Sequence, residues 1–143
     1  MSEMLSKAIL IATNAHDGQF DKGGTPYILH PLKVMHYTRS TDPEILAIAV
    51  MHDVIEDTKV TYKELRDAGI TERVIEGVRA LTKVPGETYE EYKARVKMNP
   101  DARIVKMADL RHNSDIRRLK GVTQKDIARI AKYHEFYLEL KAA

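Results

Sequence analysis

Apolar residues recur along this chain at the spacing of amphipathic helices. The first stripe consists of Leu5, Ala8, Ile9 and Ala12. Residues three and four apart lie on one face of a helix, so this stripe predicts a helix that buries one side and runs to about Gly18. Further segments repeat this spacing, and no run shows the convincing alternation that is typical of strands. The pattern therefore predicts an all-α domain of about seven helices joined by short connectors.

Capping signals divide the rest of the chain into helices. They are Asp42 before Pro43, Thr61 with Glu64, Thr71, Thr88 with Glu91, and Asn99 before Pro100. Such side chains accept hydrogen bonds from N–H groups that have no partner in a first helical turn. Pro31 suits the first turn of another helix, because it has no N–H to leave unpaired, and we expect it to keep His30 out of helical geometry at that helix entrance. Residues 121–123 then separate a last helix, so helices and connectors account for the chain.

Length and composition limit the classes of protein to which the chain can belong. It has 143 residues, of which 43% are hydrophobic and 31% charged, with a formal net charge of +2 and no cysteine. This length suits a single domain, which we place at residues 1–143, and the balance of charges argues against nucleic acid as the partner. Without thiolates, any metal ion must be held by histidines and carboxylates.

The sequence predicts no membrane segment. The longest apolar run, residues 45–51, is far shorter than the roughly 20 residues that cross a bilayer, and the N-terminus lacks a basic stretch followed by an apolar one. We therefore expect a cytoplasmic protein that binds neither membrane nor nucleic acid. Its oligomeric state is left open.

His52 and Asp53 are adjacent at the end of that apolar run. Burying an imidazole and a carboxylate is costly unless something compensates, and a divalent cation would compensate both. His30 and Asp109 could complete a set of two imidazoles and two carboxylates, which suits manganese, iron or zinc. Spacing alone favours the alternative, in which Asp109 is a surface charge and His30 an ordinary hydrogen-bonded histidine.

Polar residues near these candidates could serve the same site. Glu56 lies four positions after His52, so a continuing helical turn would bring its carboxylate back to the metal side, where it could hold or deprotonate a water molecule. An acidic loop or helix exit is an equally good interpretation. Lys106, Asp109 and Asn113 fall on one helix face, which would form either a polar wall for a phosphate or a solvated surface.

Five motifs stand out when the whole chain is considered. They read AHDGQ at residues 15–19, GTPYILHPL at 24–32, MHDVIEDT at 51–58, GVRALTK at 77–83, and VKMAD at 105–109 with His112 and Asn113. In this order they resemble the HD hydrolase domain of the RelA/SpoT family and its stand-alone relatives, the small alarmone hydrolases of the Mesh type. The motifs cover most of the chain, and five in order are far more specific than any one of them.

The resemblance implies a helical HD domain with one metal ion, usually manganese. The matching metal ligands are His30, His52, Asp53 and Asp109. Glu56 and Asp57 match the pair that positions and activates the attacking water. The family removes pyrophosphate from the 3′ side of guanosine tetra- and pentaphosphate, the alarmones of the stringent response, and Asn113 matches a residue that helps to hold the nucleotide. The implied activity is a metal-dependent (p)ppGpp 3′-pyrophosphohydrolase that acts on a small nucleotide.

Two places depart from the family pattern. Family members usually carry Arg-Lys, lining the guanosine and phosphate pocket, where this chain has Asp21 and Lys22. A carboxylate there is expected to repel a polyphosphate and cannot donate to it. Residues 114–119 replace the usual continuation after Asn113, so another nucleotide contact is expected to be lost. Lys22, Asn113 and Lys106 remain as the predicted substrate-binding residues.

The sequence leaves three functions open. The first is manganese-dependent hydrolysis of guanosine alarmones or of a related phosphorylated nucleotide, and the second is an HD nucleotidase that acts on nucleoside monophosphates. The third is a nucleotide-binding module without turnover, against which the presence of both Glu56 and Asp57 argues. The role of His16 is not readable from spacing, whereas His112, three residues after Asp109, could brace that carboxylate.

Overall fold

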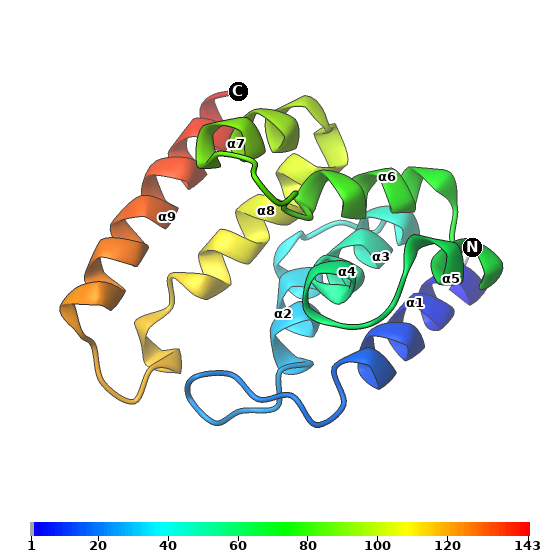
Figure 1. Cartoon of the computed structure of the whole chain (residues 1–143), viewed down its shortest axis with the longest axis horizontal. Coiled ribbons are helices and arrows are strands. Elements are labelled where there is room, and N and C mark those ends of the chain that lie inside the picture. Colours follow the sequence, from blue (N-terminus) through cyan, green and yellow to red (C-terminus); the bar gives the residue numbers. More distant parts are fainter. Residues whose placement is uncertain (1) are drawn as a thin grey trace.

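The computed structural model describes residues 2–143, and helices make up most of this range (Figure 1). In chain order they are α1 (Ser2–Ala15), α2 (Leu29–Tyr37), α3 (Pro43–Met51), α4 (Val54–Asp57), α5 (Tyr62–Asp67), α6 (Glu72–Leu81), α7 (Tyr89–Met98), α8 (Pro100–Asn113), the 3-10 helix η1 (Ile116–Arg118) and α9 (Gln124–Ala142). The predicted all-α class is confirmed, and the β-structure within residues 2–143 amounts to one isolated bridge between Phe20 and Pro26. With the single turns α4 and η1 included, this range holds more elements than the expected seven or so, because such short turns show no hydrophobic period.

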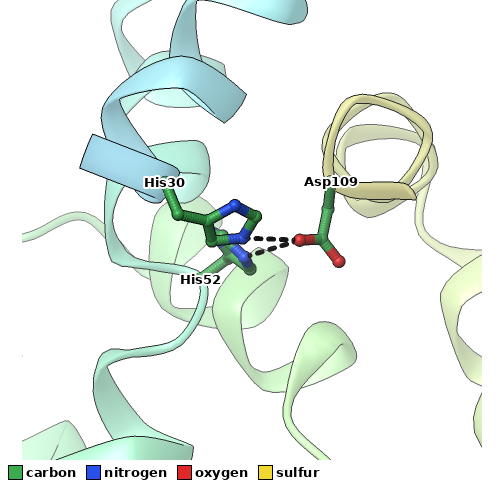
Figure 2. Close-up of side chains that lie close together, drawn as sticks. All are labelled: His30, His52 and Asp109. Carbon is green, nitrogen blue, oxygen red and sulfur yellow. Dashed lines mark hydrogen bonds and ion pairs between the residues drawn. The ribbon is translucent and has the colours of Figure 1, made fainter. Parts of the chain in front are cut away.

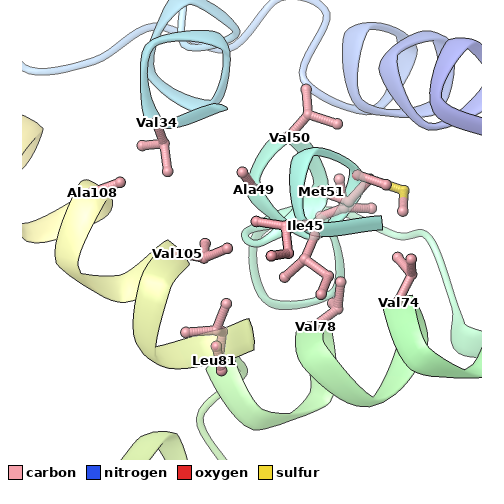
Figure 3. Close-up of a cluster of buried hydrophobic side chains, with 14 of the residues drawn as sticks. Val34, Ile45, Ala49, Val50, Met51, Val74, Val78, Leu81, Val105 and Ala108 are labelled. Atoms are coloured by element: carbon pink, nitrogen blue, oxygen red, sulfur yellow. The ribbon is translucent and has the colours of Figure 1, made fainter. Parts of the chain in front are cut away.

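Helix α3 lies at the centre of the fold, and α1, α2, α6 and α8 pack against it (Figure 3). Residues 47–51 are 0% exposed, which explains why this segment is apolar on every side rather than along one stripe. The Asp42 carboxylate fixes the start of the helix by accepting a hydrogen bond from the N–H of Glu44. Because α3 is capped at one end and buried along its length, its other end places His52 and Asp53 inside the protein.

The predicted helix caps form, with one difference. The residues whose side chains accept a first-turn N–H are Asp42, Thr61, Thr71, Thr88 and Asn99. Thr88 and Glu91 form the complete capping box. At Thr61 the Glu64 carboxylate binds the threonine hydroxyl instead of the backbone N–H, so the predicted box is only half present. A second complete box, with aspartate in place of glutamate, starts α9.

Two boundaries differ from those that the sequence predicted. Helix α1 ends at Ala15, and Gly18 takes a φ of +80° in the turn that follows, a conformation that suits glycine. His30 is helical, as the second residue of α2, so the prediction that Pro31 holds it outside helical geometry is wrong. The helical region is disfavoured before proline but not forbidden, and Pro31 still lies in the first turn, where its missing N–H costs no hydrogen bond.

Helix α9 is the longest helix and packs on α8. Its buried residues are Asp126, Phe136 and Leu140, so much of its surface faces solvent. Among the helices of residues 2–143, α9 included, none is long and apolar enough to cross a membrane.

Gly77 marks a close approach of α6 to α3, since a Cβ at this position would collide with the side chain of Ile48. Gly77→Ala is therefore expected to destabilise the protein by about 1–3 kcal/mol, as overpacking of a close-packed core does. Gly121→Ala is the matched control in a thermal melt, because its Cβ would meet no atom within 4 Å. If both variants melted at the wild-type temperature, the interface between α6 and α3 would not be tightly packed.

Candidate metal centre

Three buried side chains from separate parts of the chain meet at one point. His30 projects from α2, His52 follows α3, and Asp109 projects from α8 (Figure 2). The Oδ1 atom of Asp109 lies 2.9 Å from His30 Nε2 and 3.2 Å from His52 Nε2. One donor atom of each residue falls within 4.8 Å of the others. Imidazole nitrogens and a carboxylate oxygen gathered in this way can hold a divalent first-row metal ion.

The fourth predicted ligand, Asp53, borders this group. Its Oδ2 atom lies 3.0 Å from His52 Nε2 and 3.8 Å from His30 Nε2. Adjacent residues on a helix point apart. The helix is interrupted between α3 and α4, however, and this interruption lets His52 and Asp53 face the same point. The hydroxyl of Tyr27 donates to Asp53 Oδ2 and orients the carboxylate. The structure thus brings together the four predicted ligands, and their binding of a metal ion stays a prediction.

Contacts on the far side of each imidazole determine which nitrogen faces Asp109. His52 Nδ1 donates to the carbonyl oxygen of Ala49 at 2.7 Å, which turns Nε2 toward the cluster. His30 Nδ1 lies 2.7 Å from His112 Nδ1, and the two rings stack with centroids 5.0 Å apart. Burial and then nearby positive charge lower the pKa of His112 to about 4, so its neutral ring can accept the proton of His30 Nδ1. His112 therefore braces the His30 imidazole rather than the Asp109 carboxylate.

The carboxylates of the cluster are held in their ionised form. Although burial opposes it, the positive charges of Lys106 and His52 keep the pKa of Asp109 well below its ordinary value. Burial also opposes ionisation of Asp53, whose pKa His52 nevertheless lowers to about 2. Conversely, Asp53 and Asp109 outweigh burial and raise the pKa of His52 well above its ordinary value. A proton and a metal cation would therefore compete for the same concentration of negative charge.

A cavity of about 200 Å³ opens beside the cluster. Its lining includes His52, Asp53, Asp109, Glu56 and Asp57. Glu56 Oε1 accepts a hydrogen bond of 2.9 Å from the N–H of Lys83. Asp57 is exposed at the mouth of the cavity. Desolvation by the surrounding protein, together with the negative charges of Asp53 and Glu56, still raises its pKa to about 6. Because α4 is a separate turn, the helical continuation considered for Glu56 does not occur, but both acids still line the cavity.

Lys106 and Asn113 contact the cluster through Asp109. Lys106 Nζ lies 2.9 Å from Asp109 Oδ2, and Asn113 Nδ2 donates to Asp109 Oδ1 at 3.0 Å. The Lys106 side chain is only 15% exposed, so this face of α8 is not the solvated surface that the sequence also allowed. Both residues line the cavity, where a phosphate group would meet a positive charge and an amide.

A second cavity, of about 350 Å³, shares Tyr27, Asn113 and Tyr133 with the first. Lys22, which was predicted to bind substrate, lies at its wall with an exposed side chain. The sequence predicted no role for either tyrosine. For Tyr27 a signal existed, because it lies inside the motif at residues 24–32, whereas Tyr133 reaches the site from α9, outside every motif.

Comparisons with known proteins agree with the motifs. No family model matches the chain. Guanosine-3′,5′-bis(diphosphate) 3′-pyrophosphohydrolase of Haemophilus influenzae is 36% identical over 136 residues, which is 86% of this chain and 20% of that protein. The bifunctional (p)ppGpp synthase/hydrolase SpoT of Escherichia coli is 36% identical over 121 residues, or 76% and 17%. A GTP pyrophosphokinase of Myxococcus xanthus is 32% identical over 145 residues, or 91% and 19%.

These curated relatives are much longer proteins, and the chain spans about a fifth of their length. A solved structure of similar size matches as well. It is that of a metazoan orthologue of SpoT, described as hydrolysing ppGpp, with a TM-score of 0.78 and 23% identity over 98% of this chain and 86% of that one. At this identity the match establishes the shared fold.

The helical fold, with histidines and aspartates gathered from α2, the end of α3 and α8, defines this protein as an HD-type domain. The sequence matches narrow the class further. The chain belongs to the RelA/SpoT family of HD domains, as its motifs predicted.

Proposed function

We propose that this protein is a divalent-metal-dependent phosphohydrolase that removes pyrophosphate from the 3′ side of guanosine tetra- and pentaphosphate. The observation that carries the proposal is the convergence of His30, His52 and Asp109 beside a cavity that Glu56 and Asp57 also line. The names of the relatives support this substrate. Other relatives are named for synthesis, as GTP pyrophosphokinases. A set of metal-binding side chains next to two acidic residues is, however, what hydrolysis by an activated water needs.

The donor set fits manganese, which we propose as the metal ion. Two imidazole nitrogens and two carboxylates suit a borderline first-row cation and leave coordination positions for water and substrate. His30, His52, Asp53 and Asp109 would hold it. When bound, such an ion supplies Lewis-acid polarisation of a phosphoryl oxygen and makes water acidic enough to attack at neutral pH.

The remaining chemistry belongs to side chains of the cavity. Glu56 and Asp57 position the attacking water and take its proton, and a pKa of about 6 leaves Asp57 mostly ionised at neutral pH. Lys106 places a buried positive charge beside the cluster, where it favours the approach of a phosphate anion. No covalent intermediate with the protein is required.

The test is to incubate purified protein with Mn²⁺ and a panel of nucleotides that includes guanosine tetraphosphate, and to identify the products. We expect GDP and pyrophosphate from guanosine tetraphosphate, and no turnover without divalent metal. Orthophosphate from nucleoside monophosphates would instead establish a nucleotidase. Metal binding without turnover of any nucleotide would leave a binding module.

A further inference from the structure

The two segments that depart from the family pattern lie against each other. The Nη2 atom of Arg118, in η1, is 3.4 Å from Asp21 Oδ2, in the loop between α1 and α2. A Cβ at Gly23 would collide with the backbone carbonyl oxygen of Arg118. Figure 1 places this loop and the segment after α8 at the same edge of the molecule. Positions 21 and 118 are thus spatial neighbours although they are far apart in sequence.

Asp21 does not present the repelling charge that its position in the sequence suggested. The carboxylate is 15% exposed, and its Oδ1 atom accepts a hydrogen bond of 2.9 Å from the N–H of Thr25. Burial alone would raise the pKa of Asp21, but the N–H of Thr25 and the charge of Arg118 outweigh it and lower this pKa below its ordinary value. Asp21 is therefore an ionised anchor whose charge Arg118 balances.

Arg118 is linked to the predicted metal ligand Asp109 through the side-chain amide of Asn113. Its Nη1 atom donates to Asn113 Oδ1 at 3.0 Å and to the carbonyl oxygen of His112 at 3.2 Å. The other end of the same amide, Asn113 Nδ2, donates to Asp109. The guanidinium thus has a fixed position relative to the predicted metal site.

The guanidinium keeps donors available for a ligand. Among residues 2–143, neither its Nε–H nor the second N–H of Nη2 has an acceptor, while its other N–H groups do. The side chain is 22% exposed and lines the cavity of about 350 Å³, together with Lys22. This volume lies in the range of small-ligand pockets, and an arginine with free N–H groups binds phosphate oxygens in bidentate fashion.

We propose that Arg118 binds the phosphate groups at the 5′ end of the substrate, which do not react, and that Asp21 is the residue that positions it. This inference rests on the proposed function, because it assigns the reacting 3′ end to the metal cluster and the 5′ end to the adjoining cavity. The guanidinium that the loop lacks at position 21 is thereby supplied from η1.

The test compares Arg118→Ala with Arg117→Ala, the matched control. Arg117 is the next residue in the chain, but its side chain is 84% exposed, pairs with Asp115 and is not part of the cavity wall. We expect Arg118→Ala to raise KM for guanosine tetraphosphate about 10- to 100-fold, the range for lost hydrogen bonds to a charged group, with kcat changed by less than about threefold. Arg117→Ala should stay within about twofold of the wild type in both constants.

A substrate without 5′ phosphates separates phosphate binding from a structural role. With guanosine 3′-diphosphate, the Arg118→Ala protein should have nearly the wild-type KM. Asp21→Asn should raise KM for the tetraphosphate by less than Arg118→Ala does, and the double variant should resemble Arg118→Ala, because a positioning residue has no effect once its target is gone. Equal losses on both substrates, or additive losses in the double variant, would overturn the inference.

Calorimetric titration with GDP makes the result independent of turnover. GDP carries the 5′ diphosphate and has no 3′ phosphate to react. If the wild type hydrolysed the tetraphosphate and Arg118→Ala had a normal KM and normal GDP affinity, the inference would be wrong and the proposed function would stand. If the wild type did not hydrolyse the tetraphosphate, but Arg118→Ala bound GDP at least tenfold more weakly, the proposed function would be wrong and Arg118 would still be the binding residue for a 5′ diphosphate. A wild type that does not bind GDP also overturns the inference.

Discussion

Asp109→Asn is expected to abolish divalent metal binding and to lower kcat/KM for guanosine tetraphosphate by about 10⁴-fold or more, the scale on which loss of an essential catalytic group acts. Asp109 faces both imidazoles and is also bound by Lys106 and Asn113. Asparagine keeps the shape of the side chain but removes its negative charge. Metal content measured by mass spectrometry, together with product release, checks the result.

The control for this variant is Asp101→Asn on the same helix. Asp101 pairs with Arg73 and lies away from the cluster, so this variant should keep its metal and its activity. Asp109→Asn also leaves the Lys106 charge without its partner, which costs about 3–5 kcal/mol when a buried pair is broken. His52→Ala serves as a second variant, since it removes a ligand without leaving that charge unpaired. If either variant kept a full complement of metal and wild-type activity, the metal centre would not be where we place it.

Glu56→Gln is expected to keep its metal and to slow hydrolysis by about 10²- to 10⁴-fold, which is the contribution of a general base. Glutamine can still accept the hydrogen bond from the N–H of Lys83, so the fold of this turn is preserved. What it cannot do is take a proton from water at neutral pH. The measurement is kcat under saturating Mn²⁺ and substrate, together with metal content.

Glu64→Gln provides the comparison for Glu56→Gln, because Glu64 is an exposed acid on α5 whose side chain contacts Thr61. It should leave kcat unchanged. Full activity of the Glu56→Gln protein would show that Glu56 takes no part in the reaction. Loss of metal from that protein would instead show that Glu56 is a metal ligand.

Local sequence patterns predicted the parts of the fold that depend on local interactions. The cap at Asp42 and the apolar run at residues 45–51 specify α3, because both a first-turn hydrogen bond and burial on all sides leave a mark in neighbouring residues. The candidate ligands His52 and Asp53 could be recognised for the same reason: two polar residues at the end of a buried helix need compensation.

Contacts between distant residues could not be predicted in this way. The sequence allowed His112, three residues after Asp109, to brace that carboxylate, but its partner is His30, on a different helix. Asp21 was expected to repel a polyphosphate, and its pairing with Arg118, which spans most of the chain, could not be foreseen. Helical periodicity carries information about neighbours on one helix and none about which loop lies opposite.

The contact between the loop of Asp21 and η1 has an evolutionary consequence. The proposed reaction chemistry depends on residues fixed to the buried end of α3 and to α8, where substitutions are costly. The contact between the loop of Asp21 and η1 lies instead between two connecting segments at the edge of the fold. Selectivity for a nucleotide can therefore diverge among relatives while the chemistry is retained, provided that both segments change together. Redesign of the specificity should accordingly exchange the two segments as a unit.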